Sequence, residues 1–102
     1  MKFICKVILH NAGIYADAYP EIKRDFENFF NVKPNDNTDN IFDLVLEADS
    51  VHELRSEIFK PLRLSAIANG LKYYSLYLKV NEDYAHDFII NTDIDKIRLD
   101  KL

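Results

Sequence analysis

Hydrophobic and polar side chains alternate most regularly in residues 71–80, LKYYSLYLKV. A period of two places successive side chains on opposite faces of a β-strand. One set is Tyr74, Leu76, Leu78 and Val80, and the other is Tyr73, Ser75, Tyr77 and Lys79. The first set is apolar and is expected in the core, whereas the second mixes two tyrosines with a lysine. The segment therefore predicts a strand with one buried face and one mixed face.

Residues 2–10 and residues 41–49 show the same alternation. In the first segment both faces are largely apolar, which is typical of a strand in the middle of a sheet. In the second segment the inward set is Phe42, Leu44, Leu46 and Ala48, and the outward set is Ile41, Asp43, Val45 and Glu47. Residues 81–83 predict a turn, and residues 84–91 predict the second arm of a hairpin.

Helical periodicity appears first in the segment that follows residue 16. The residues Ile22, Phe26, Phe29 and Phe30 have the spacing of one apolar stripe. Asp17 is the expected N-cap, with Pro20 in the first turn. The helix is expected to end near Asn31, because Pro34 disfavours helical geometry in the residue before it. The polar residues 33–40 predict a loop, and a short edge strand is conceivable at residues 30–33.

A second helix is predicted to begin at Ser50, because Ser50 and Glu53 have the spacing of a capping box. Its apolar face carries Val51, Leu54 and Ile58. Pro61 predicts a kink or a new helix start, since proline in a helix interior costs about 3 kcal/mol. Gly70 is a suitable residue to end the helix. The tail, residues 92–102, fits a strand or a short helix equally well.

These elements predict one α+β domain over residues 1–102, a small two-layer sandwich of helices on a sheet. The first choice of topology is the ferredoxin-like order βαββαβ with an extra C-terminal strand, which includes the short strand at residues 30–33. The second choice, without that strand, is βαβαββ. No repeat and no family motif is recognisable in the sequence.

Composition narrows the functional classes. The chain is 48% hydrophobic and 29% charged, with a net charge of −4, which is typical of a globular protein and disfavours a nucleic-acid partner. Cys5 is the only cysteine, so neither an intramolecular disulfide nor a thiolate metal cluster is expected. No signal peptide and no membrane span is recognisable, and we expect a cytoplasmic protein without a cofactor.

The mixed strand faces are the strongest functional signal. If both helices cover one side of the sheet, an apolar and aromatic patch remains on the other side, and such patches usually mark binding surfaces. The residues predicted to bind a partner are Ile4, Lys6, Ile8, Asp43, Val45, Glu47, Tyr73, Ser75 and Tyr77. Alternatively, the C-terminal tail covers this face.

Three functions remain open at this point. The first is a non-catalytic protein-binding module, a small acidic inhibitor, immunity or adaptor-type protein that binds another protein or forms a homodimer. The second is a single-stranded nucleic-acid binder, in which Tyr73 and Tyr77 stack on bases. The third is a metal-dependent hydrolase using Asp43 and Glu47. The histidines stand apart, at His10, His52 and His86, with no metal-binding spacing. We expect the first function, and no catalytic residue.

Overall fold

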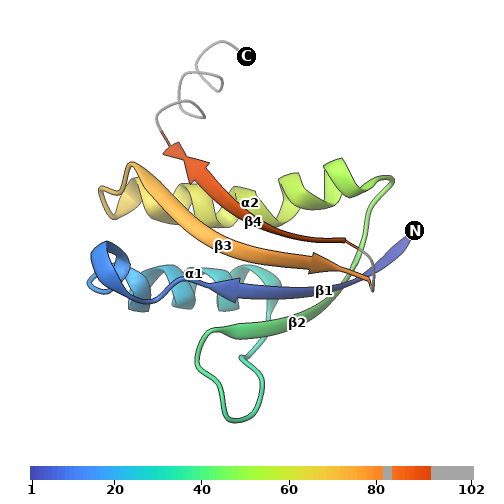
Figure 1. Cartoon of the computed structure of the whole chain (residues 1–102), viewed down its shortest axis with the longest axis horizontal. Coiled ribbons are helices and arrows are strands. Elements are labelled where there is room, and N and C mark those ends of the chain that lie inside the picture. The colour runs from blue at the N-terminus through green and yellow to red at the C-terminus, as the bar shows by residue number, and fades with distance from the viewer. Residues whose placement is uncertain (82–83, 93–102) are drawn as a thin grey trace.

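The computed structural model describes residues 1–81 and 84–92, which form one sheet and two α-helices (Figure 1). In chain order the elements are β1 (Lys2–Leu9), the short 3-10 helix η1 (Gly13–Tyr15), α1 (Tyr19–Phe30), β2 (Ile41–Glu47), α2 (Val51–Ala68), β3 (Tyr73–Val80) and β4 (Tyr84–Asn91). In the view of Figure 1 the sheet lies in front of both helices, so the helices cover the same side of it. The predicted α+β class and two-layer arrangement are confirmed.

The sheet has the order β2-β1-β3-β4, and each neighbouring pair is antiparallel. The strand predicted to be central, β1, lies between β2 and β3 as expected. The described elements follow the order βαβαββ, which was the second choice. The short strand of the first choice does not form, because α1 continues to Phe30 and Asn31 then takes a left-handed conformation with φ 54°. This residue turns the chain away from an extended path.

The strands bury one set of alternating side chains and expose the other, as predicted. On each strand every second side chain points at the helices, and these side chains on β1 and β3 are almost completely buried. The largest fully buried side chains include Val7 and Leu9 of β1, Ile22 and Phe26 of α1, Phe42 of β2, Leu54, Ile58 and Leu62 of α2, and Tyr74 and Leu78 of β3. Burying one such side chain contributes about 1.5–3 kcal/mol. The core is therefore a single layer between the sheet and the two helices.

Helix α1 ends at Phe30 with Asn31 as its C-cap, as predicted, but its start and one residue of its apolar stripe differ from the prediction. Its N-cap is Ala18, without a side-chain bond, and not Asp17. The start is set by Tyr19, which is buried and donates a hydrogen bond of 3.0 Å from its hydroxyl to the carbonyl oxygen of Asp39. In the last turn Phe29 is 52% exposed and packs edge-on against Phe30. The expected stripe of four residues is thus incomplete at Phe29.

Helix α2 begins as predicted. The backbone N–H of Glu53 donates to the Ser50 hydroxyl oxygen at 3.1 Å, and the Glu53 carboxylate accepts from the N–H of Asp49 at 3.1 Å. The predicted kink or restart at Pro61 is wrong, because the helix continues through it to Ala68. Pro61 is buried against the core, and the carbonyl that loses its partner belongs to Glu57, an exposed residue that water can reach.

The end of α2 is a Schellman motif. Gly70 has φ +75°, and its N–H donates to the carbonyl of Ile67 at 3.1 Å. The N–H of Leu71 donates to the carbonyl of Ala66 at 2.9 Å. Such an ending reverses the chain directly into β3. At the same end of the sheet, Thr92 follows β4 and donates from its hydroxyl to the carbonyl of Leu71 at 2.8 Å. The tail expected at 92–102 otherwise lies outside the described residues.

The register of β3 makes a first prediction. Leu76 is 3% exposed and lies on the helix side of the sheet. Leu76→Ala should lower the free energy of unfolding by about 2–5 kcal/mol, because it removes buried methyl groups and leaves a cavity. Chemical denaturation measures this loss. A variant as stable as the native protein would contradict the assigned register.

The cap of α2 makes a second prediction. Ser50→Ala should cost about 1 kcal/mol, since the Glu53 N–H then loses its partner in the first turn. Ser56→Ala is the matched control, because the Ser56 hydroxyl donates to the carbonyl of His52 within the helix and alanine is the better helix former there. Equal denaturation midpoints for Ser50→Ala and the native protein would show that Ser50 does not cap the helix.

Candidate functional site

The side of the sheet that faces away from α1 and α2 is the candidate site, and we call it the outer face. It is formed by the outward side chains of the four strands. All nine residues that the sequence predicted as partner-binding lie here, with Ile4, Lys6 and Ile8 on β1, Asp43, Val45 and Glu47 on β2, and Tyr73, Ser75 and Tyr77 on β3. The structure thus brings them together, while their role in binding stays a prediction.

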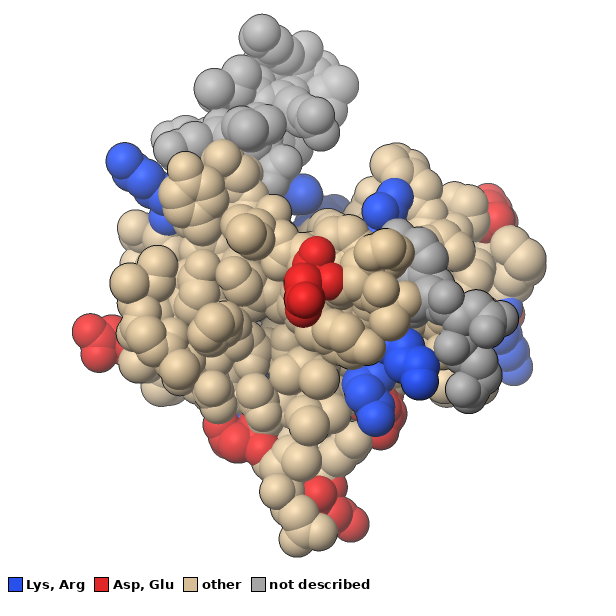
Figure 2. All heavy atoms as spheres, viewed as in Figure 1, with Lys and Arg blue, Asp and Glu red and all other residues tan. Residues whose placement is uncertain are grey.

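Large apolar side chains are exposed on this face. Ile4 is 66% exposed and Val45 64%, and these two residues are directly opposite each other on β1 and β2. Tyr73 is 47% exposed and Ile89 of β4 70%. Figure 2 views the same side and shows uncharged atoms over most of the surface, with an acidic group near the middle of the view and basic groups to its right.

The sequence analysis missed the contribution of β4. Ser75 is opposite Ile89 and Tyr77 is opposite Asp87, so both β4 residues share the outer face with their partners. The alternation of β4 could have revealed this contribution, because residues opposite each other in a hairpin point to the same face once the register is known. The turn at 81–83 alone did not give that register.

Charged residues on the outer face follow the strand pairs. Lys2 is opposite Glu47, and Lys6 is opposite Asp43. Lysines therefore occupy the central strand β1, while carboxylates stand on the edge strand β2. Asp43 and Glu47 are four residues apart on one strand, which separates them by about 13 Å at ~3.3 Å per residue. This spacing is too large for one metal ion to be held by both carboxylates.

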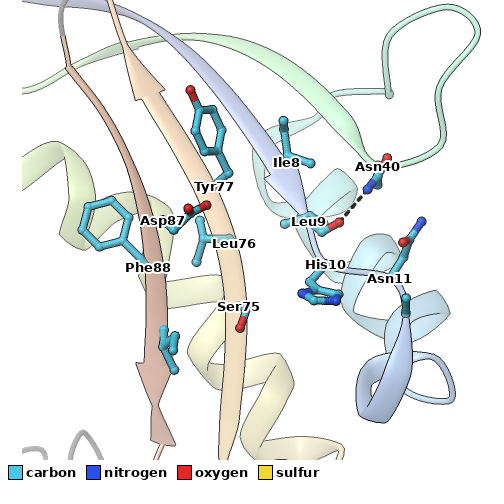
Figure 3. Close-up of a pocket in the computed structure, with 12 residues that line it drawn as sticks. Ile8, Leu9, His10, Asn11, Asn40, Ser75, Leu76, Tyr77, Asp87 and Phe88 are labelled. Carbon is cyan, nitrogen blue, oxygen red and sulfur yellow. Dashed lines mark hydrogen bonds between the residues drawn. The ribbon is translucent and has the colours of Figure 1, made fainter.

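A hollow of about 460 Å³ opens on the outer face near the end of β1 (Figure 3). We call it the hollow. Its lining includes the side chains of Ile8, His10, Ser75, Tyr77, Asp87 and Ile89. Figure 3 shows Tyr77 and Asp87 projecting beside each other from neighbouring strands. The hollow thus combines apolar walls with the phenol ring of Tyr77, the imidazole of His10 and one carboxylate.

Hydrogen bonds to the core fix one wall of the hollow. The fully buried Tyr74 donates from its hydroxyl to the carbonyl of His10 at 2.7 Å. Tyr15 packs edge-on against both of them, with ring centroids 4.9 Å from His10 and 5.1 Å from Tyr74. The hydroxyls of Tyr15 and Ser75 share a hydrogen bond of 3.1 Å. Asn40 donates from its side-chain amide to the carbonyl of Leu9 at 2.7 Å. These bonds make the shape of this wall largely independent of a ligand.

Other reactive groups do not join the hollow. Cys5 is 1% exposed, and burial raises the pKa of its thiol to about 11. His52 lies at the start of α2, 3.5 Å from the guanidinium of Arg55. The described part of the chain contains no group of three His, Cys, Asp or Glu side chains that could hold a metal ion.

Comparisons with known proteins give no assignment. No protein-family model, no curated protein and no solved structure matches the chain. Among residues 1–81 and 84–92, no helix has the length and apolar character needed to cross a membrane. The outer face itself is therefore the basis for a functional proposal.

The buried tyrosine beneath the hollow makes a third prediction, on pH dependence. Burial raises the pKa of the Tyr74 hydroxyl well above its ordinary value of 10.0. Between that value and the folded pKa, the folded chain keeps a proton that the unfolded chain loses. The free energy of unfolding therefore falls as pH rises above about 10, by about 1.4 kcal/mol per pH unit for this group.

Tyr74→Phe removes this titration. The variant should be less stable at neutral pH, because the carbonyl of His10 loses its donor. Its stability should nevertheless fall less steeply between about pH 10 and 11. Tyr19 and Cys5, whose pKa values burial also raises, remain in both proteins. Urea unfolding over this pH range measures both slopes, and equal slopes would contradict the assignment.

Proposed function

We propose that the protein is a non-catalytic binding module that docks a basic protein partner on the outer face. In this proposal it acts as a small acidic inhibitor, immunity or adaptor-type protein in the cytoplasm, by covering part of the partner's surface. The nine predicted residues on β1, β2 and β3 form the contact surface, and Asp87 and Ile89 of β4 extend it.

One observation carries the proposal. Four large apolar side chains on the outer face are 47–70% exposed: Ile4, Val45, Tyr73 and Ile89. Ile4 and Val45 stand near one end of the outer face and Tyr73 and Ile89 near the other, with the half-buried Ile8 and Tyr77 between them. Single exposed apolar residues are common on proteins, but apolar residues spread along the whole of one sheet face favour an interaction surface. Tyrosine suits such a surface because it supplies a large contact area and a hydroxyl at a small loss of conformational entropy.

Charge favours a basic protein over a second copy. The chain carries a net charge of −4, so two copies repel each other at long range while a basic partner is attracted. The edge carboxylates Asp43 and Glu47 on β2, with Asp87 on β4, would meet basic groups at the margin of such an interface. Charge pairs at a margin act mainly on the association rate.

The two alternative functions have weaker support. A nucleic-acid binder would use Tyr73 and Tyr77 as stacking platforms, but the carboxylates of Asp43, Glu47 and Asp87 offset the three lysines of this face and leave no basic stripe for phosphates among the described residues. A hydrolase would need Asp43 and Glu47 on one metal ion, and their separation of about 13 Å on one strand argues against it. Neither alternative accounts for the exposed aliphatic side chains.

The fourth prediction tests the face. Tyr73→Ala and Tyr77→Ala should each weaken partner binding by about 1–3 kcal/mol, as expected for aromatic anchors. Their free energies of unfolding should change little, because both side chains point away from the core. Binding is measured by calorimetry, with a partner captured from the source cell, then identified and purified. Asp43→Lys should slow association and change its salt dependence.

Matched controls come from the helices. Phe29 of α1 and Leu64 of α2 are 52% and 50% exposed but lie outside the sheet, so Phe29→Ala and Leu64→Ala should leave binding intact. Loss of binding in these controls instead would assign the contact to the helix face and overturn the proposal.

Other occupants of the face give different results. A dimer in sedimentation that dissociates in Tyr73→Ala would assign the outer face to a second copy and overturn the basic partner. Binding of single-stranded nucleic acid that Asp43→Lys strengthens and salt weakens steeply would favour the second function. Large losses of stability in both tyrosine variants, with binding unchanged, would show that the chain itself covers the face.

A further inference from the structure

We infer that the hollow on the outer face receives an arginine side chain of the basic partner, with Asp87 and Tyr77 as its recognition pair. This inference rests on the proposed function and adds the chemical group that the face recognises. It is drawn from the side chains that line the hollow, from the absence of an ion pair at Asp87 within the described part of the chain, and from the geometry of the strand pair that carries both groups.

The recognition pair is fixed by the hairpin. Tyr77 and Asp87 are directly opposite each other on β3 and β4, and the Cβ atoms of such a pair are about 4.5–5.5 Å apart. Both side chains project on the same side of the sheet (Figure 3). A planar cation between them can lie on the aromatic ring and reach the carboxylate at the same time.

The Asp87 carboxylate is available for this contact. The ion pairs of the described residues join Lys23 to Asp39, Arg24 to Glu21 and Lys33 to Glu27. None of them involves Asp87, and no side-chain hydrogen bond within the described part of the chain reaches its carboxylate. Lys79 is opposite Ala85, one pair further along β3 and β4 on the outer face, and does not line the hollow. Within residues 1–81 and 84–92, an arriving cation therefore has no ion pair to displace at Asp87.

The remaining walls suit the stem of an arginine. Ile8 and Ile89 line the hollow and offer apolar surface to the three methylene groups. The hydroxyl of Ser75 is already bonded to that of Tyr15, and Asp87 is the only carboxylate among the described residues that line the hollow. Arginine fits better than lysine, because its planar guanidinium both stacks on an aromatic ring and binds a carboxylate through two parallel hydrogen bonds.

The fifth prediction tests the hollow without the partner. The probes are N-acetyl-arginine amide, the lysine equivalent, and the citrulline equivalent, which has the shape of arginine but no charge. Each probe is titrated against the full chain while backbone amide chemical shifts are recorded. The arginine probe should shift the amides of Ser75, Tyr77 and Asp87, the lysine probe should bind more weakly, and the citrulline probe should have little effect.

Variants locate the contact. Asp87→Asn should weaken binding of the arginine probe about tenfold, as expected for a lost charge-assisted hydrogen bond. Tyr77→Leu should weaken it as well, since it keeps an apolar wall but removes the ring face. Glu57→Gln is the control, because Glu57 is exposed on α2, and it should leave probe binding unchanged. Unchanged amide spectra away from the hollow verify that the variants fold.

Three results would overturn the inference. Equal binding of citrulline and arginine would show that the hollow does not recognise charge, and equal binding of lysine would exclude a preference for guanidinium. Unchanged probe binding in Asp87→Asn would place the contact elsewhere. The proposed function can fail separately, because partner binding that depends on Phe29 or Leu64 would contradict the docking face while the arginine probe still bound.

Discussion

Two helices of 12 and 18 residues cover only one face of the four-stranded sheet, and this coverage determines the chemistry of both faces. The period of two in a strand sends every second side chain towards the helices, where Tyr74 and Leu78 are 0% exposed. The intervening side chains are thereby placed together on the opposite side, whatever their character. In the described part of the chain no helix packs on that side. The side chains on that side therefore do not have to be apolar in order to pack in the core.

The hollow depends on the core although it lies on the outer face. Tyr74 is buried beneath it, and its hydroxyl holds the carbonyl of His10 at the end of β1. Tyr15 is 8% exposed and packs between these two residues, and its hydroxyl meets Ser75 on the outer side. Because a buried hydroxyl without a partner costs about 1–3 kcal/mol, these contacts define one arrangement of the wall. If the outer face binds a partner as proposed, a wall held in this way would lose little conformational entropy on binding.

Alternation alone predicted three strands, their buried faces and the residues that now share the outer face. The alternation pattern gave a wrong prediction where the conformation of a single residue decides the direction of the backbone. Asn31 takes a left-handed conformation that no hydrophobic pattern reveals, and it removed the expected edge strand. Pro61 stays inside α2 because the carbonyl it leaves unpaired belongs to an exposed turn, a fact of three-dimensional placement. The hollow was also out of reach, since it needs the register that pairs Tyr77 with Asp87.

An open sheet face without a partner would normally carry polar side chains, because antiparallel sheets with one solvated face alternate apolar and polar residues. The outer face of this sheet departs from that expectation, and the character of its side chains changes from one row across the strands to the next. The row through Ile4 and Val45 is aliphatic, and the row through Lys6 and Asp43 is charged. The row through Ile8, Tyr77 and Asp87 combines both characters at the hollow. Packing among residues 1–81 and 84–92 requires none of these choices, since the side chains point away from the core. The proposed partner, with apolar and cationic groups, would contact the apolar rows directly and the carboxylates of the others.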